Sequence, residues 1–393
     1  MAFLSKDVRD IRLKRLREVM SRKDLDAVVL FGVDSEFYTN WIVDVQVWER
    51  PIAVVIPRDG ETFGVLHSLS TNHIRFARER GSLWLDEVVF YYEHRRLGAT
   101  LYPEFHRLVA DRLRDRGFEG ARFGHDGASG HMEKIVSFLG AGSFFSCDLD
   151  LRDLRQVKLP EEIAVMREAA DLSDWLQARY MENIRPGRLI QELDLEMQRQ
   201  GVEEAARRFP GENCEWRIYT LRGAHSASPH GNGAQTGAKI EAGDGLVNII
   251  IPRLNGLCVE NERTIFCGRP TAQQEAAFGV ALEAQIAAIE AMRPGLPVCG
   301  IDDAARTLIE AAGYGDNIVH RTGHGVGMRG HEYPADTAFN TRPLEEGEVY
   351  SAEPGIYIWG VGGFRLDDTV VVGDTPEVLT KAPKDIADLV IGL

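Results

Sequence analysis

The stretch from residue 245 to residue 268 reads GLVNIIIPRLNGLCVENERTIFCG, and its centre predicts a β-hairpin. Asn255 and Gly256 both tolerate the positive φ angles of a two-residue turn, and β-rich runs flank them on either side. A turn of this length places Leu254 opposite Leu257. The sequence therefore predicts an antiparallel hairpin whose register is set by its turn.

Two acids share one face of this hairpin. The same register places Ile249 opposite Glu262 and Ile251 opposite Glu260. Because successive strand residues alternate faces, both glutamates point to the same side, about 7 Å apart, whereas Asn248 falls on the other side. Such a pair would bind a metal ion, hold a cationic substrate or raise the pKa of one acid. The alternative is an exposed edge strand with solvated acids, which the facing isoleucines make less favourable.

Length and composition bound the class of protein. A chain of 393 residues is too long for one typical core, so we expect two domains. Its contents of 44% hydrophobic and 27% charged residues are typical of a soluble globular protein. The formal net charge of −15 disfavours binding to nucleic acid or to anionic membranes, which need clustered basic residues.

Several classes of segment and site are not expected. The apolar stretches fall well short of the run of about 20 residues that spans a bilayer, and the N-terminus lacks the pattern of a secretory signal. We therefore expect a cytoplasmic protein. The five cysteines form no CxxC pair, which argues against a disulfide framework or a thiolate metal site.

The pattern of helices and strands changes near residue 157. Residues 1–157 alternate helical and strand-like segments, which predicts an α/β domain with a mixed sheet. At Pro160 a proline followed by two acids opens a long helix that starts an α+β domain over residues 158–393. The main elements that we expect are a helix at about 5–24, strands at 26–31 and 52–56, a helix at about 188–207, and two strand hairpins separated by helices at about 271–293 and 299–313.

Further polar motifs of the second domain fall on expected strands or strand ends, so their side chains would converge on one pocket. They are Pro229-His230, Gly323-His324-Gly325, Gly330-His331-Glu332, Glu353-Pro354-Gly355 and Arg365-Leu366-Asp367-Asp368. Glu353 lies inside the strand-like run 349–358, where a buried carboxylate needs a partner. Asp367 and Asp368 face opposite sides of their strand, and Asp367 is the site candidate. The motifs indicate a hydrolase site.

These motifs resemble the pita-bread superfamily of methionine aminopeptidase, aminopeptidase P, prolidase and creatinase. The resemblance covers most of residues 158–393 and, more weakly, the N-terminal domain; it implies a creatinase/prolidase-like N-terminal domain and a pita-bread catalytic domain. The metallopeptidase members carry five metal ligands, and the matching positions here are Asn248, Glu260, His324, Glu353 and Asp367. Three of these depart from the family pattern. If a metal is bound, the resemblance implies Glu260, His324, Glu353 and Asp367 as ligands.

The departures resemble the creatinase branch, which hydrolyses a guanidino carbon without metal. The likeness lies in Val247-Asn248, Glu262-Arg263-Thr264 and Glu353-Pro354. It implies that Glu262 and Glu353 bind the cationic C–N group of the substrate. It also implies that His230 transfers the proton, with His225 as the rival for that role. No cofactor is favoured on this reading, and a divalent metal is the alternative.

The resemblance also suggests residues that bind the substrate. In creatinase-like dimers an aromatic residue and an arginine of the neighbouring subunit hold the substrate, and Trp48 and Arg50 lie at the matching distance before a strand. A purely structural reading has Trp48 packed locally and Arg50 solvated. Within the second domain the expected substrate-binding residues are Glu260, His324, His331 and Asp367.

We therefore expect a creatinase-like hydrolase that cleaves a C–N bond in a small guanidino, ureido or amidine-type substrate, without metal and as a homodimer. The first alternative is a metal-dependent Xaa-Pro aminopeptidase or dipeptidase, in which His331 assists turnover. The second alternative is a pita-bread protein that binds a small molecule without turnover. The missing aspartates are the reason for preferring the first reading.

Overall fold

The computed structural model describes residues 4–40, 50–231 and 237–392, and the chain forms two compact units. The division falls between Arg155 and Gln156, whereas the sequence places the boundary after Val157. Val157 belongs to the second unit because it forms a β-bridge with Glu348. The next residue, Lys158, donates its backbone N–H to the carbonyl oxygen of Gly347 at 2.9 Å.

The N-terminal unit is an α/β fold on one mixed sheet, as the alternating pattern predicts. Its helices are α1 (Lys6–Lys23), α2 (Val33–Thr39), α4 (Thr71–Arg80), α5 (Phe105–Asp115), α6 (Ser129–Leu139) and α7 (Asp148–Gln156), and its strands are β1 (Ala27–Leu30), β2 (Ala53–Pro57), β3 (Phe63–His67), β4 (Glu87–Tyr91), β5 (Arg122–His125) and β6 (Ser143–Ser146). The six strands are ordered β4-β3-β2-β1-β5-β6, with β1 parallel to β5 and antiparallel to β2. Apolar residues of α5 and α6 pack on this sheet to form the core.

The C-terminal unit is built on an eight-stranded sheet with the main order β11-β14-β10-β8-β7, to which β9, β15 and β16 attach. Its strands are β7 (Cys214–Arg222), β8 (Gly245–Leu254), β9 (Leu257–Cys258), β10 (Asn261–Cys267), β11 (Val349–Ala352), β12 (Gly355–Ile358), β13 (Gly362–Arg365), β14 (Asp367–Val371), β15 (Glu377–Val378) and β16 (Val390–Ile391). Strands β12 and β13 form a separate two-stranded sheet. The unit is thus α+β, as expected.

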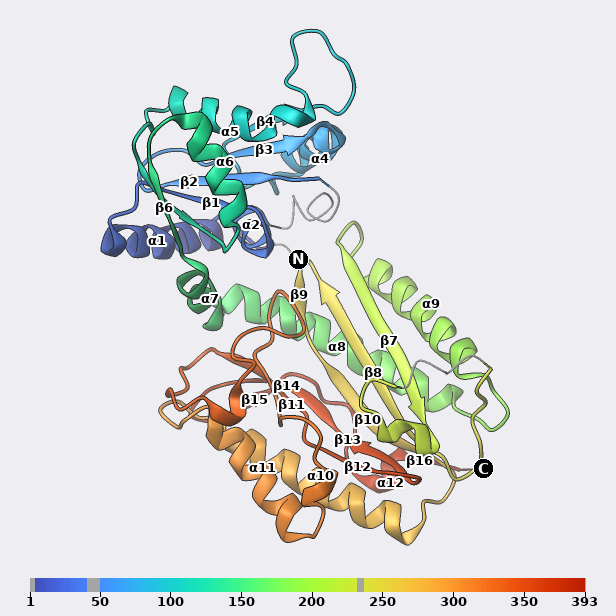
Figure 1. Ribbon diagram of the computed structural model, residues 1–393. Coiled ribbons are helices and arrows are strands. Elements are labelled where there is room, and N and C mark those ends of the chain that lie inside the picture. Colours follow the sequence, from blue (N-terminus) through green and yellow to red (C-terminus); the bar gives the residue numbers. More distant parts are fainter. Residues whose placement is uncertain (1–3, 41–49, 232–236, 393) are drawn as a thin grey trace. The chain divides into compact units, whose positions relative to one another are not determined.

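Helices cover this sheet along its length. They are α8 (Pro160–Asn183), α9 (Ile190–Arg208), α10 (Ala272–Glu290), α11 (Cys299–Ala311) and α12 (Ile386–Leu389), with short 3-10 turns at η3 (Gly223–Ala227), η4 (Gly315–Asn317) and η5 (Thr337–Phe339). Helices α8 and α9 lie beside β8 and β7, and α10 lies beside β11, β12 and β13 (Figure 1). Helix α8 begins at Pro160 as predicted, and Glu162 accepts a hydrogen bond from the backbone N–H of Leu159 at 2.7 Å. A single core cluster joins the helices to the strands.

The hairpin has the predicted register. Asn255 and Gly256 have φ angles of 44° and 82°, as a two-residue turn of this hand requires. Leu254 pairs with Leu257, and Glu262 lies opposite Ile249. Strand β10 is an interior strand between β8 and β14, and all seven of its residues are buried. The edge-strand alternative for its acids is therefore wrong.

One predicted strand is two strands. The run from Val349 to Ile358 breaks at Glu353 and Pro354, so that β11 and β12 belong to different sheets. A proline has no N–H to donate to a strand ladder, which explains the break. Glu353 therefore lies at the end of β11 and not inside a continuous strand; its own N–H donates to the carbonyl of Thr322 at 2.7 Å.

The helix-facing side of β10 is held by a buried ion pair. Arg263 and Asp368 are both 0% exposed, and their charged atoms are 2.8 Å apart. The guanidinium also donates to the carbonyls of Ala382 and Pro383 at 2.8 and 2.9 Å, and Asp368 accepts from Lys384 at 2.8 Å. Because every donor and acceptor of the pair has a partner, the charges are tolerated in the core.

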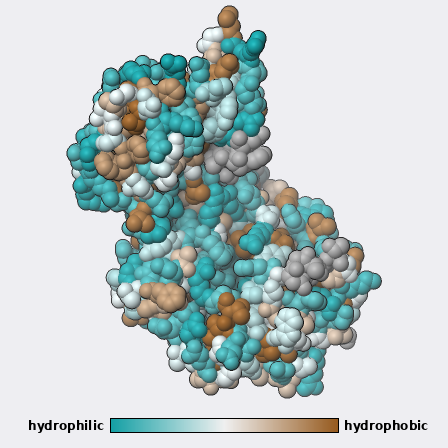
Figure 2. Space-filling model, viewed as in Figure 1, coloured by the Kyte–Doolittle hydropathy of each residue, from teal (hydrophilic) through white to brown (hydrophobic). Residues whose placement is uncertain are grey.

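Helix length and surface hydropathy bear on whether a chain can span a membrane. No helix among the described residues is both long and apolar enough to span a bilayer. On the face shown in Figure 2, hydrophilic residues dominate and hydrophobic ones lie in small scattered groups. The five cysteines are all free thiols, in keeping with the absence of paired spacing in the sequence.

The buried pair yields a stability prediction. Arg263→Met leaves Asp368 buried and short of its principal cation, so we expect the free energy of unfolding to fall by about 3–5 kcal/mol. Arg167→Met is the matched control, since Arg167 pairs with Glu377 at the surface with side chains 50% and 45% exposed. Urea denaturation followed by circular dichroism measures both. Equal losses in the two variants would contradict the role assigned to the buried pair.

Candidate active site

Three buried acids meet across β10 and β14. Glu260 and Glu262 share one face, and Asp367 lies directly opposite Glu262 on the neighbouring strand. Their exposed fractions are 3%, 4% and 0%, and like charges opposite each other in a sheet are unfavourable. Both carboxylate oxygens of Asp367 and Oε1 of Glu260 lack a hydrogen-bond partner among the described residues. Buried acids left in this state point to a binding site.

His324 links these acids to Glu353. Its Nε2 atom lies 3.4 Å from Glu260 Oε2 and 3.2 Å from Glu353 Oε1. The ring of His331 stacks on it with centroids 3.8 Å apart. Two groups of three side chains each have possible ligand atoms within 4.8 Å of one another. The first is Glu260, His324 and His331, and the second is Glu262, Glu353 and Asp367.

Glycines on both sides hold His324 in place. Gly323 and Gly325 run so close to the neighbouring backbone that a Cβ atom on either would collide with a carbonyl oxygen, of Ser351 or of Tyr333. The N–H of His324 also donates to the hydroxyl of Ser351 at 3.1 Å. The Gly-His-Gly motif is therefore needed for a close backbone approach.

Arg365 is a site residue to which the sequence assigns no role. Its guanidinium forms an ion pair with Glu262 and lies 4.0 Å from Glu353. It also donates to the hydroxyl of Tyr357 at 3.3 Å and, at 3.4 Å, to the carbonyl of Pro229. The sequence offers one signal for this role, since Arg365 lies two residues before Asp367. Its partner Glu262 cannot be predicted in this way, because it lies in another sheet.

The acids of the cluster differ in the direction in which their pKa values are shifted. Burial raises the pKa of Asp367 well above its usual value, and the neighbouring carboxylates Glu262, Glu260 and Glu353 add to the effect. Burial also raises the pKa of Glu262 to about 8, against the opposing charge of Arg365. The pKa of Glu353 is lowered in spite of burial, because the imidazole of His324 lies 3.2 Å away and, when protonated, favours the carboxylate. Glu353 is thus ionised at neutral pH, whereas Asp367 and Glu262 hold a proton more strongly than ordinary carboxyl groups do.

The donor set fits a divalent cation. Four carboxylates, Glu260, Glu262, Glu353 and Asp367, face one guanidinium and one imidazole, so the ionised cluster carries excess negative charge. Oxygen donors with one or two imidazoles suit divalent ions. Strand β8 adds no ligand, because the residues on the same face, Ile249 and Ile251, are apolar.

Asn248 does not join the site. It pairs with Arg263 on β10 and Thr220 on β7, so its side chain lies on the face opposite Glu262. The resemblance matches this position to a metal ligand, but the continuous pairing with both neighbouring strands keeps the Asn248 side chain on the other face. The family pattern of two acidic ligands on this hairpin is therefore reduced to the single acid Glu260, with Glu262 added two residues later.

The histidines expected for proton transfer lie differently. His230 and His225 are both exposed, but His230 lines a pocket together with Glu260 and His331, whereas His225, on η3, is not among the lining residues. Burial and the charges of Arg365 and Arg217 lower the pKa of His230. The pKa of His331 is also lowered, by burial and by His324, so both rings are neutral at pH 7.

The substrate-binding residues expected from the N-terminal unit are Trp48 and Arg50. Trp48 is outside the described residues. Arg50 forms an ion pair with Glu93 at 2.6 Å within its own unit. Their action across a homodimer stays a prediction.

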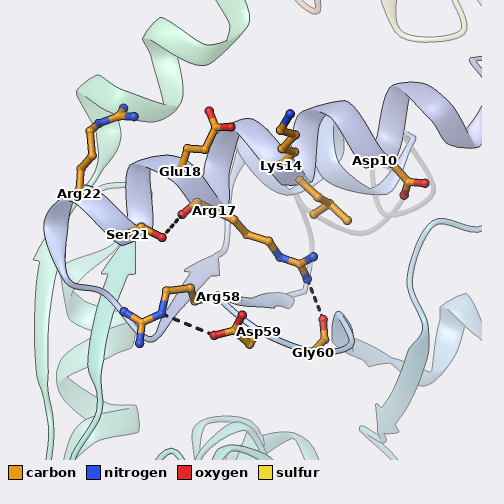
Figure 3. A pocket seen from close by; sticks show the side chains of 10 residues that line it. Asp10, Lys14, Arg17, Glu18, Ser21, Arg22, Arg58, Asp59 and Gly60 are labelled. Carbon is orange, nitrogen blue, oxygen red and sulfur yellow. Dashed lines mark hydrogen bonds and ion pairs between the residues drawn. The ribbon is translucent and has the colours of Figure 1, made fainter.

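A larger cavity in the N-terminal unit has different chemistry. It is about 860 Å³ in volume, lies between α1 and the turn at residues 58–60, and is lined by side chains of both signs (Figure 3). Arg17 donates to the carbonyl of Gly60 at 2.7 Å, and Arg58 lies 3.7 Å from Asp59. The acid and histidine clusters lie instead in the C-terminal unit.

The glycine clamp around His324 is testable. Gly323→Ala forces a Cβ atom against the backbone of Ser351, and we expect it to destabilise the protein by roughly 1–3 kcal/mol. Gly279→Ala in α10 is the control, since no heavy atom lies within 4 Å of the added Cβ atom and alanine favours helix by about 0.5–1 kcal/mol. Urea unfolding measures both. A neutral Gly323→Ala variant would show that His324 is not held by this contact.

Comparison with known proteins places this site in a family. Metallopeptidase family M24 matches residues 164–374. An uncharacterized peptidase of Staphylococcus aureus is 32% identical over 342 residues, which are 86% of this chain and 89% of that protein. A dipeptidase from Mycobacterium ulcerans is 26% identical with a TM-score of 0.80 and full coverage of both chains. A prolidase from Pyrococcus horikoshii shares the fold with a TM-score of 0.79 at 24% identity, over 95% of this chain and 99% of its own.

These matches confirm the pita-bread fold and the superfamily of creatinase, aminopeptidase P and prolidase. The named relatives are peptidases, so they favour the peptidase alternative over hydrolysis of a guanidino substrate. The chain is a hydrolase and belongs to metallopeptidase family M24.

Proposed function

We propose that the protein is a dipeptidase of the Xaa-Pro type, which hydrolyses the peptide C–N bond of a small substrate with the help of one divalent cation. The observation that carries the proposal is the buried cluster of four carboxylates and His324, whose excess negative charge is not matched by the protein. The peptidase relatives support the choice of a peptide bond.

The size of the adjoining pocket supports a short substrate. It has a volume of about 460 Å³ and is lined by Glu260, His230, His331 and Ile251, among others. Small-molecule sites fall mostly in the range of about 300–1,000 Å³. A dipeptide fits this range, whereas a long polypeptide would need an extended groove.

The acids and histidines of the site have separate roles in this proposal. Glu353 is ionised and is a ligand to the cation, and the attacking water gives its proton to a histidine of the pocket. His230 and His331, which are neutral at pH 7, pass a proton on to the leaving nitrogen. Arg365 holds Glu262 in place and limits repulsion between the carboxylates. Pairs of groups with pKa values shifted apart are typical of such division of labour.

The residues that would hold the cation are Glu260, His324, Glu353 and Asp367. When bound, a divalent ion supplies a Lewis acid for the peptide carbonyl and favours deprotonation of water.

Activity after removal of metal tests the proposal. The protein is dialysed against a chelator and assayed with Ala-Pro, Gly-Pro and Ala-Ala, before and after Mn²⁺, Co²⁺ or Zn²⁺ is restored. We expect hydrolysis of the proline dipeptides to be lost on chelation and to return with metal, because the acid cluster needs a counter-charge. Absence of dipeptide hydrolysis with every ion would refute the proposed function.

Binding of the ion is measured separately from turnover. We expect isothermal titration to give one Mn²⁺ ion per chain, and Asp367→Asn to weaken binding roughly 10-fold or more. Without metal, Asp367→Asn removes an unfavourable buried acid and should raise the melting temperature. Asp316→Asn, at an exposed acid of η4, is the control for both measurements. Equal affinity in the two variants would place the ion elsewhere.

A second candidate is the creatinase-like hydrolase without metal. Two observations favour it: Arg365 already neutralises Glu262, and β8 presents apolar Ile249 opposite Glu262 and so adds no ligand for an ion. In this reading Glu262 and Glu353 bind the cationic group of the substrate and His230 transfers the proton. Hydrolysis of a guanidino, ureido or amidine acid that persists in chelator would select this candidate over the dipeptidase.

A further inference from the structure

Strand β7 presents one arginine to the pocket. Its even-numbered residues face α9: Thr220 donates to Asp194 at 2.6 Å, and a Cβ atom on Gly201 would lie 3.0 Å from the ring of Trp216. Because strand residues alternate, Arg217 and its odd-numbered neighbours face the other side. The packing of Trp216 against a glycine of α9 therefore fixes the direction of Arg217.

Cross-strand pairing places Arg217 on the same face as the acid cluster. Arg217 lies opposite Ile251, which in the hairpin register faces Glu260. Arg217, Ile251, Glu260 and His230 all line the pocket of about 460 Å³. The pocket therefore has a carboxylate on one wall and a guanidinium on β7.

The guanidinium of Arg217 is exposed and has no acidic partner in the described part of the chain. Within residues 4–40, 50–231 and 237–392 it makes no hydrogen bond or ion pair, and its contact is with the Tyr219 ring, 5.2 Å from the centroid. Arg253 of the same pocket differs, because it pairs with Glu215 at 3.3 Å. Arg365 is likewise paired, with Glu262. Arg217 is thus the cation of this wall that is open to a ligand.

We propose that Arg217 binds a carboxylate of the substrate and makes the enzyme selective for substrates that carry one. The inference rests on the proposed dipeptidase function and extends it to specificity. A guanidinium binds a carboxylate through two parallel hydrogen bonds, and the cross-strand neighbour of Arg217, Ile251, offers no acid that would compete for it. The carboxylate is supplied either by the C-terminus of a dipeptide or by an acidic side chain.

Three substrates separate these sources. Ala-Pro carries a C-terminal carboxylate, Ala-Pro amide carries none, and Glu-Pro amide carries one on a side chain. We expect the wild-type protein to prefer Ala-Pro or Glu-Pro amide over Ala-Pro amide by roughly 10- to 100-fold in kcat/KM, the range of a charged hydrogen bond. The preferred substrate identifies the source. Equal kcat/KM for all three would overturn the proposal.

Arg217→Met should remove that preference. We expect it to lower kcat/KM for the carboxylate substrate to the level of Ala-Pro amide, mainly through KM, and to leave Ala-Pro amide within about twofold. Arg217→Lys, which keeps the charge but loses the fork, should be intermediate. Arg199→Met, at an exposed arginine of α9, is the control. An equal loss on all three substrates in Arg217→Met would show a structural role and overturn the proposal.

A binding measurement keeps this test separate from the proposed function. L-proline and L-prolinamide are compared by the shift that each causes in the melting temperature of the metal-loaded protein. We expect a larger shift with L-proline or, if the side-chain source applies, with L-glutamate over L-glutamine, and loss of the difference in Arg217→Met. If no dipeptide is hydrolysed, the proposed function fails, but this difference still decides for or against Arg217. Equal shifts in wild type and Arg217→Met would refute its role.

Discussion

The charges on the two sides of strand β10 determine what the rest of the C-terminal unit has to provide. On the helix-facing side, Arg263 and Asp368 neutralise each other and are saturated by the backbone of residues 382–383 and by Lys384. On the other side, Glu262 lies opposite Asp367 with no such saturation. A sheet can bear this repulsion because the saturated side anchors the same two strands. The ion pair on the helix-facing side of β10 therefore offsets the repulsion between the acids on the other side.

Strand β8 presents apolar side chains to the pocket and no acid. Ile249 and Ile251 face the same side as the two glutamates and pack with Leu221, Val247 and Tyr219. An apolar strand beside an acidic strand strengthens electrostatic interactions near it, because it excludes water. The same isoleucines give no oxygen donor to a second cation. The site is therefore acidic on the β10 side only.

The parts of the site that could be predicted depend on local structure. The turn at Asn255-Gly256 fixes the register, and alternation then places Glu260 with Glu262 and separates Asp367 from Asp368. The pairing of Arg365 with Glu262 could not be derived in this way, because β13 belongs to another sheet and a long side chain bridges the two.

The place of Glu353 required knowing that Pro354 ends a strand, and the direction of Arg217 required the packing of β7 on α9. Both features depend on tertiary packing, which leaves no periodic pattern in the sequence. The same holds for the histidines: the spacing of the motifs does not predict that His324 and His331 stack, or that His230 lines the pocket and His225 does not.

The charge balance of the cluster limits how it is completed. Four carboxylates meet Arg365, which leaves three negative charges when His324 is neutral, as a metal ligand must be, and two when His324 is protonated. One divalent cation bound through neutral His324 offsets two of the three charges. Without metal, a proton on Asp367 and one cationic group of a substrate offset the two charges that remain beside protonated His324. Arg365 thus acts as a built-in counter-charge, which lowers the positive charge needed to complete the site.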